Sequence, residues 1–275
     1  MDGVAVIYKL RSVFISQRWG QWLKPLVIPI VLLAMWQAWA PLEGSTSGIA
    51  PTPSGVARGF WELTVSGELP SSLFESLTRI ASGFCIAFTL GIAMAICVWY
   101  VRLAEYLIDP LIETFRPIAP IAWIPLAILW FGTGTWAAIF IVSYAIFFPV
   151  FVNTLAGLQS LDKRLLDAAL TLGATKYMMI RDVVLPGALP SIVLGGRLGM
   201  GAGWAAIIAA EMTVGSKSGG GASGGIGQMM FIFLSYSLEL RYIIVGMITV
   251  GCVAYMIDSV FRIVQRRISP WIQTS

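Results

Sequence analysis

The feature that most constrains this chain is a series of apolar runs that are long enough to cross a lipid bilayer. A membrane-spanning helix needs about 20 predominantly apolar residues. Hydrophobic residues make up 57% of the 275 and charged residues only 12%, which is too little charge to cover a soluble domain of this size. We therefore predict an all-α membrane protein with one transmembrane domain over residues 23–275 and six transmembrane helices, at about residues 23–39, 73–101, 117–131, 136–158, 190–212 and 242–264.

The segments outside these runs differ in character. Residues 1–22 mix basic and apolar side chains, a pattern typical of a helix lying in the cytoplasmic membrane interface. Residues 41–71, with one short surface helix, and the glycine-rich residues 214–227 are predicted to be loops on the outer side. The polar residues 102–113 are predicted to form a loop on the inner side. Arg79, near the outer end of its run, is expected to extend to the interface.

Basic residues flank the runs unevenly. One set of flanks holds Lys9, Arg11, Arg18, Lys24, Arg102, Arg116, Lys163, Arg164, Lys176, Arg181, Arg262, Arg266 and Arg267. The other set holds only Arg58, Lys217 and Arg241. Because basic residues accumulate on the cytoplasmic side of membrane proteins, we predict that both termini and residues 159–186 are cytoplasmic.

The composition excludes several kinds of chemistry. There is no histidine, which removes the usual general base and a common metal ligand. An intramembrane enzyme would also lack paired carboxylates. Cys85, Cys97 and Cys252 lie in apolar runs without metal-type spacing, and we expect them to be small buried residues. The basic residues are scattered along the chain, so the net charge of +4 indicates membrane topology rather than binding to nucleic acid.

A polar stretch, residues 159–186, separates the fourth and fifth runs. Its apolar residues recur at helical spacing, Ser160 or Asp162 can cap a first helix, and Gly173 suits the left-handed position that ends it. Thr175 can cap a second helix, which the proline at the end of the stretch is expected to stop. The pattern predicts two short helices that meet at a glycine. By itself it is equally typical of an ordinary amphipathic loop.

The same stretch contains a spaced motif: Asp167-Ala168-Ala169, three residues, Gly173, nine residues, then Val183-x-Leu185-Pro186. This spacing resembles the coupling motif of permeases in ATP-binding-cassette (ABC) importers, which reads Glu-Ala-Ala, Gly and Ile-x-Leu-Pro. Asp replaces Glu and Val replaces Ile here. Further segments resemble the nitrate/sulfonate/bicarbonate/taurine-type branch of that family, at residues 51–63, 115–132, 189–212 and 262–271.

The resemblance implies a type I importer (MetI-like) permease fold, as a homodimer in the lipid of a bacterial inner membrane. An extracytoplasmic solute-binding protein would deliver a small anion such as nitrate, bicarbonate, a sulfonate or taurine. ATP and Mg²⁺ would bind to cytoplasmic ABC ATPase subunits; this chain has no GxxxxGK[ST] loop and would hold no cofactor or metal. The residues expected to couple it to the ATPase are Asp167, Ala168, Ala169, Leu172, Gly173, Ala174, Leu185 and Pro186.

The solute pathway is expected along one face of the fifth run. Arg197 and Glu211 are fourteen residues apart, about 21 Å of helix, and charges at membrane depth commonly face protein or water. We expect this face, with Trp204, to border the pathway and Arg197 to attract an anion. The alternatives are that Arg197 pairs with an acid or a carbonyl, and that Glu211 reaches the outer interface. Pro120 and Trp123, in the proline-rich third run, are a second candidate lining.

A competing function is that of a stand-alone secondary carrier or channel. Such carriers often place acids or histidines near the bilayer midplane and show repeated halves, and neither is evident in this sequence. A carrier also has no need of the charged pair of helices predicted at residues 159–186.

Overall fold

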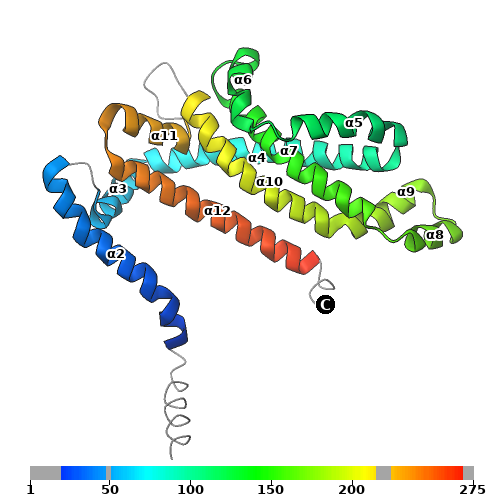
Figure 1. Cartoon of the computed structure of the whole chain (residues 1–275), viewed down its shortest axis with the longest axis horizontal. Helices are drawn as coiled ribbons and strands as arrows, with labels where there is room; N and C mark the ends of the chain where they lie inside the picture. Colours follow the sequence, from blue (N-terminus) through cyan, green and yellow to red (C-terminus); the bar gives the residue numbers. More distant parts are fainter. Residues whose placement is uncertain (1–19, 48–50, 215–223, 269–275) are drawn as a thin grey trace, which may run out of the picture.

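The computed structural model describes residues 20–47, 51–214 and 224–268. Within these ranges the chain is helical with short connections, which confirms the all-α class (Figure 1). The predicted interfacial segment at residues 1–22 lies almost wholly outside the described residues, and so does most of the glycine-rich loop at 214–227.

Four long helices form the body of the molecule: α4 (Glu68–Tyr100), α7 (Thr135–Gln159), α10 (Leu185–Val214) and α12 (Leu240–Ile268). They coincide with the second, fourth, fifth and sixth predicted runs, and each is long and apolar enough to cross a membrane. Helix α7 packs against both α4 and α10, and α12 packs on α10 (Figure 1).

Glycines let α10 approach α7 closely. A Cβ atom at Gly199 would lie 3.0 Å from Cγ2 of Ile146, and one at Gly203 would lie 2.7 Å from Cδ1 of the same side chain. At Gly195 a Cβ would lie 3.0 Å from the carbonyl oxygen of Pro149. A small-residue stripe of this kind brings two helix backbones into contact where no hydrophobic effect drives the association.

The third predicted run is not a single helix. Helix α5 (Arg102–Phe115) ends first, and a 3₁₀ turn, η1 (Pro120–Trp123), and α6 (Ile124–Phe131) follow at a bend of 93°. The prediction of a loop at residues 102–113 is therefore wrong. The run predicted at 117–131 is helical only from Pro120 and begins with the 3₁₀ turn, as expected of a helix that its prolines shorten or kink. Prolines at 117 and 120 contribute to the break because each lacks an amide hydrogen. A proline also disfavours helical geometry in the residue before it, and Ala119, which precedes Pro120, is extended with a ψ of 136°.

The number of membrane crossings in the described residues is smaller than predicted. Four helices are long and apolar enough to span, or up to five if α5 and η1–α6 together form one broken span. The first predicted run lies in α2 (Gly20–Ser47), whose shorter apolar part is Val27–Ala40. The count of six spans stays a prediction.

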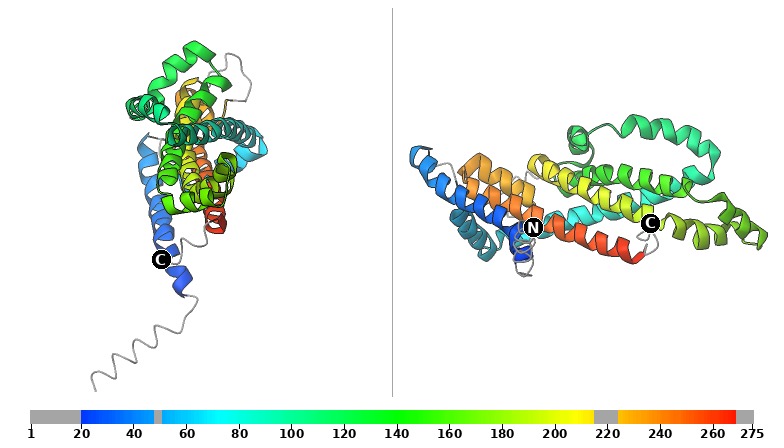
Figure 2. Two further views of the ribbon diagram at one scale, coloured as in Figure 1. Left: turned by 90° about the vertical axis from the view of Figure 1, so that its right-hand side faces the viewer. Right: turned by 60° about the horizontal axis from the view of Figure 1, so that its bottom comes forward.

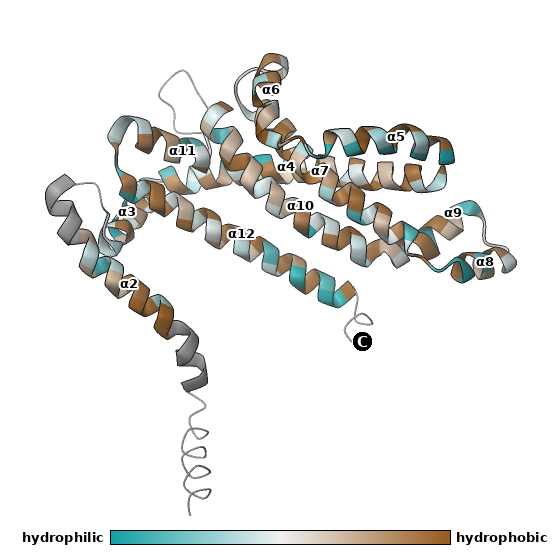
Figure 3. Ribbon diagram, viewed as in Figure 1, coloured by the Kyte–Doolittle hydropathy of each residue, from teal (hydrophilic) through white to brown (hydrophobic). Residues whose placement is uncertain are grey.

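The two ends of the bundle carry different elements (Figures 1 and 2). One end holds α3 (Pro53–Val65), α11 (Ile226–Ile232) and η3 (Phe233–Ser237), and the other holds α8 (Lys163–Thr171) and α9 (Lys176–Met178). Helix α3 confirms the short helix predicted within residues 41–71; Oγ1 of Thr52 caps it by accepting a hydrogen bond from the amide of Gly55 at 3.1 Å. Hydrophilic residues gather on α8 and near the C-terminal end of α12 (Figure 3).

The three cysteines lie on the outside of the protomer. Cys85, Cys97 and Cys252 are all exposed, so the prediction that they are buried is wrong. An apolar run buries only one face against the rest of its own chain, and the opposite face stays apolar because it meets lipid or another subunit rather than water. Hydropathy therefore does not tell which face a residue occupies.

Candidate coupling surface and transmembrane sites

The polar stretch folds as predicted up to its central glycine. Asp162, rather than Ser160, caps α8, since its Oδ1 accepts a hydrogen bond from the amide of Arg164 at 2.9 Å. Gly173 has a φ of +82°. The amide of Ala174 donates to the carbonyl of Ala169 at 3.0 Å, and that of Gly173 donates to Leu170 at 3.0 Å. This pair of bonds is the Schellman termination, which requires a left-handed residue.

The second helix starts as predicted, but it does not end at the proline where we expected it to end. Oγ1 of Thr175 accepts a hydrogen bond from the amide of Met178 at 3.3 Å and caps α9. A π-helical segment, η2 (Met179–Val184), follows and leads directly into α10, so the prediction that Pro186 ends the helix is wrong. The wide turns of a π-helix accommodate a proline that cannot donate to the preceding turn. The result is one continuous helical run, Lys176–Val214, of 39 residues.

Residues 159–184, which we call the knob, have an inner and an outer face. On the inner face Leu161, Leu166 and Met179 pack on the core at the end of the bundle. Elsewhere on the knob, four apolar side chains have large exposed fractions: Leu165 59%, Leu170 55%, Leu172 88% and Tyr177 70%. We call these four residues the docking face. An apolar surface on an otherwise hydrophilic element marks a contact with a partner.

The other predicted coupling residues surround this face. Asp167 and Ala168 are exposed on α8, and Ala169 and Ala174 are half-buried. Leu185 and Pro186 are exposed at the junction of η2 and α10. The structure therefore brings the first half of the motif onto the knob and the second half onto the joint that connects the knob to the membrane domain.

A buried polar cluster occupies the opposite end of the bundle. Glu211 of α10 is 1% exposed, and its carboxylate lies 3.0 Å from the guanidinium of Arg79. The carboxylate also accepts hydrogen bonds from Oγ of Ser76 at 2.8–2.9 Å and from the amide of Gly227 at 3.0 Å. Arg79, itself 5% exposed, also donates to the carbonyl of Gly224 at 2.8 Å. Because both side chains are buried, the expectation that Arg79 extends to the membrane interface is wrong. The alternative that Glu211 reaches the outer interface is wrong for the same reason.

This cluster holds the start of α11 against α4 and α10. Oγ of Ser76 accepts a hydrogen bond from the amide of Ile226 at 2.9 Å. A Cβ at Gly225 would lie 2.1 Å from Oε1 of Glu211, and the φ of this glycine is +85°. The close approach of backbone to carboxylate therefore needs glycine at this position, and the buried charges are compensated at every named contact.

Arg197 has a partner on the last helix. Its Nε lies 2.5 Å from Oδ1 of Asp258, and Asp258 also accepts a hydrogen bond from Arg262 at 2.6 Å. Both members of the first pair are about one-third exposed. This is the alternative in which Arg197 pairs with an acid, and it links α10 to α12. Trp204 lies in the main core at 4% exposure, so Arg197, Trp204 and Glu211 do not form one open face.

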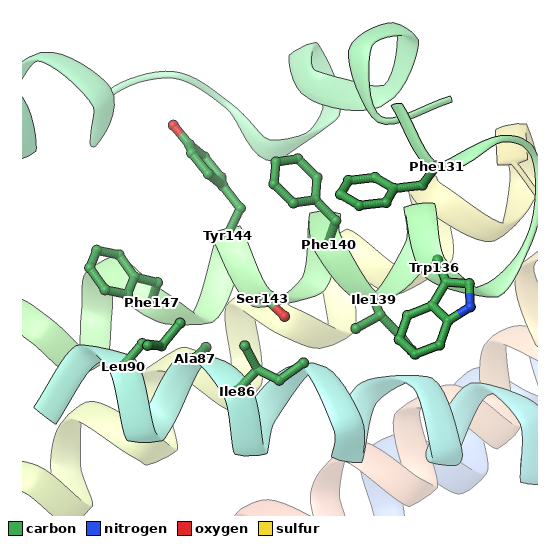
Figure 4. A pocket seen from close by; sticks show the side chains of 10 residues that line it. All are labelled: Ile86, Ala87, Leu90, Phe131, Trp136, Ile139, Phe140, Ser143, Tyr144 and Phe147. Atoms are coloured by element: carbon green, nitrogen blue, oxygen red, sulfur yellow. The ribbon is translucent and has the colours of Figure 1, made fainter. Parts of the chain in front are cut away.

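Two hollows lie along α7. The first, of about 340 Å³, is an apolar groove between α4 and α7, lined by side chains that include Ile86, Leu90, Phe140 and Phe147 (Figure 4). The second, of about 370 Å³, lies between α7, α10 and the connection from α5 to η1. Pro120 lines the second hollow, and Trp123 is half-buried among aromatic rings beside it.

Comparison with known families decides what kind of protein this is. The profile of the family described as binding-protein-dependent transport system inner membrane component matches residues 87–274, which is well over half of the chain. The chain belongs to this family.

The permease is similar to curated proteins over most of its length. It is 33% identical to the putative aliphatic sulfonates transport permease protein SsuC of Bacillus subtilis (strain 168) over 255 residues, which cover 93% of the permease and 89% of that protein. It is 33% identical to the taurine transport system permease protein TauC of Escherichia coli (strain K12) over 248 residues, covering 88% and 86%. These matches confirm the resemblance drawn from the motifs.

The fold of the permease is similar to that of a solved ABC transporter. The inward-facing MetNI methionine ABC transporter matches it with a TM-score of 0.64 and 19% identity, over 74% of the permease and 98% of that chain. This match confirms the MetI-like fold. Together with the apolar helices, the family identifies the chain as a multi-pass inner-membrane permease subunit of an ABC importer.

The role of Asp258 in the permease was not predicted from the sequence. A signal was present, because Asp258 is an acid inside the last apolar run, four residues before Arg262, and such acids usually have a cationic partner. Nothing in the spacing pointed to Arg197, which is 61 residues away. Likewise, the 132 residues between Arg79 and Glu211 gave no indication that they pair.

We expect the melting temperatures of single and double variants to show that Arg197 and Asp258 stabilise the permease as a pair. Arg197→Leu alone should leave Asp258 partly unpaired and lower the melting temperature of the purified permease by several degrees, and Asp258→Leu should do the same. The double variant should be less destabilised than the sum of the two, because neither charge is left without its partner. Strictly additive losses would show that the pair does not contribute to the α10–α12 contact.

Proposed function

We propose that the permease is the transmembrane subunit of an importer that moves a small anion into the cytoplasm, driven by ATP hydrolysis on a partner ATPase. The observation that carries the proposal is the docking face: four apolar side chains stay exposed on a hydrophilic knob at one end of the bundle. The knob ends in η2, which continues into α10 without a helix break. A displacement of the knob by a partner would therefore be transmitted along α10 into the membrane domain.

The proposed ATPase contact consists of the docking face and the coupling motif. Asp167 and Ala168 border the exposed side chains, and Gly173 sets the angle between α8 and α9. Leu185 and Pro186 lie at the joint, directly after the π-helical turns that interrupt the α-helical hydrogen-bond pattern. We assign the same role to Ala169, Leu172 and Ala174 through their positions on or beside the Schellman turn.

The proposal includes partners that supply what this chain lacks. ATP and Mg²⁺ bind to the cytoplasmic ABC ATPase, because this sequence has no phosphate-binding loop. An extracytoplasmic solute-binding protein delivers the solute at the end that carries α3 and α11, and a second copy of the permease completes the pathway within the lipid. The uneven distribution of basic residues supports cytoplasmic termini and a cytoplasmic knob.

The relatives support an anionic solute. Those in Bacillus subtilis and Escherichia coli are named for aliphatic sulfonates and for taurine, and both solutes carry a sulfonate group. Nitrate and bicarbonate carry the same single negative charge as a sulfonate group, although taurine also carries an ammonium group. No observation favours a stand-alone carrier or channel over the ABC permease.

The proposal is tested by the binding of the ATPase to a variant permease. Leu172→Glu places a charge at the most exposed side chain of the docking face and should lower co-purification of the ATPase by about tenfold or more, since a charge buried in an apolar contact is strongly unfavourable. Leu238→Glu is the matched control, because Leu238 is 72% exposed and lies between η3 and α12, at the end of the bundle opposite the knob. Equal ATPase recovery with both variants would contradict the assigned contact.

A further inference from the structure

The hollow between α7, α10 and the α5–η1 connection lies about midway along the bundle. Tyr144 and Asn153, which line it, are the tenth and nineteenth residues of the 25-residue helix α7. Helix α5 starts at the knob end and runs back for 14 residues, about 20 Å, before it delivers Arg116 to the hollow. A cationic side chain counted by sequence among the cytoplasmic flanks thus lines a hollow midway along α7, where it is exposed.

Arg116 differs from Arg79 and Arg197 in its contacts. Arg79 pairs with Glu75 and Glu211, and Arg197 pairs with Asp258. In the parts of the chain that the structure describes, no carboxylate lies within 4.0 Å of the guanidinium of Arg116, including that of Glu113 one turn earlier. An exposed guanidinium without a carboxylate partner can form a charge-assisted contact with an anion that enters the hollow.

The surroundings hold Arg116 in place and add hydrogen-bonding capacity. The hydroxyl of Tyr144 donates to the carbonyl of Phe115 at 2.5 Å, which ties the residue before Arg116 to α7. Nδ2 of Asn153 donates to the carbonyl of Pro149 at 2.8 Å, which uses one of its two amide hydrogens and leaves the other. The opposite wall is apolar and includes Leu198 and Ala202.

We propose that this hollow is an anion-binding subsite of the membrane domain, in which the guanidinium of Arg116 binds the sulfonate group of the solute. A guanidinium presents paired N–H donors that match two oxygens of an oxyanion. The volume of about 370 Å³ is at the small end of the range for ligand sites, which suits a small sulfonate. The inference rests on the proposed function and assigns to Arg116 the attraction that the sequence suggested for Arg197.

The test uses the complete importer in proteoliposomes, with its ATPase and its binding protein, and labelled taurine as the probe. Arg116→Gln should lower the initial rate of uptake by about tenfold or more, because it removes a charge-assisted contact. Arg116→Lys should retain more activity than Arg116→Gln. The matched control is Arg102→Gln, because Arg102 is exposed at the other end of α5 and should be neutral.

A second variant tests the same hollow without touching Arg116. Leu198→Glu places a carboxylate on the opposite wall and should also lower uptake, whereas Leu198→Gln should not, because only the charge repels the anion. If the importer with Arg116→Gln fails to assemble, the difference in uptake between Leu198→Glu and Leu198→Gln tests the subsite instead. Uptake by Arg116→Gln, or by Leu198→Glu, at the rate of its control would overturn the subsite while leaving the importer intact. A wild-type importer that takes up no taurine and no ethanesulfonate would overturn the proposed anion transport itself.

Discussion

Replacing Gly173 with valine is expected to lower coupled import by about tenfold or more while the ATPase still binds. Gly173 has a φ of +82°, where any residue with a Cβ is strained by about 1–2 kcal/mol and a β-branched residue by more. No atom lies within 4 Å of a Cβ built there, so the strain comes from the backbone and not from a clash. The chain can relieve it by changing the turn, which would re-aim α8 and its part of the docking face relative to α9.

The variant is measured by ATP-driven uptake and by ATP hydrolysis in the same proteoliposomes. We expect uptake to fall by about tenfold or more while hydrolysis persists, because a shift of this kind misplaces a contact without removing it. Gly251→Val is the matched control: a Cβ at Gly251 also meets nothing within 4 Å, but its φ is that of an ordinary helix. Coupled uptake by Gly173→Val at the rate of this control would contradict the role assigned to the turn.

Replacing Glu211 with leucine is expected to be the most destabilising single change in the membrane domain. It would leave Arg79 buried without its partner from α10 and remove the acceptor for the amide of Gly227. Breaking a buried ion pair by removing one member typically costs about 3–5 kcal/mol. The contact that holds α11 would be lost first, since three of the named bonds meet at the start of that helix.

The measurement is the melting temperature and the yield of monodisperse permease in detergent. Glu239→Leu is the control, because Glu239 pairs with Arg241 at 2.9 Å but is 40% exposed, and exposed pairs contribute only about 0–1 kcal/mol. The double variant with Arg79→Leu should recover part of the loss. Equal melting temperatures for Glu211→Leu and Glu239→Leu would show that the buried cluster does not stabilise the fold.

Local signals in the sequence predicted the knob well. Asp162, Gly173 and Thr175 act on groups within a few residues of themselves, so the helix start, the left-handed turn and the second cap follow from residue type alone. The continuation past Pro186 could not be predicted in the same way. A proline ends a helix unless the backbone widens to π-helical turns, and that choice depends on how the segment packs against the bundle.

The ion pairs between distant helices could not be predicted from the sequence. Hydropathy located α4, α7, α10 and α12, because a membrane imposes length and composition on a span. It could not show that Arg79 meets Glu211 or that Arg197 meets Asp258, since those contacts depend on the rotation of each helix about its axis. For the same reason it placed Arg116 with the cytoplasmic residues, although the bend after α5 sets this residue at a hollow along α7.

The most direct test of the central claim is ATP-dependent accumulation of labelled taurine in proteoliposomes that contain the permease, its ATPase and its binding protein. We predict that ATP hydrolysis rises when the loaded binding protein is added, and that taurine accumulates only when ATP is present. Leu172→Glu should remove both responses. Accumulation without ATP, driven by an ion gradient and unaffected by Leu172→Glu, would contradict the account and identify the permease as a carrier that works alone.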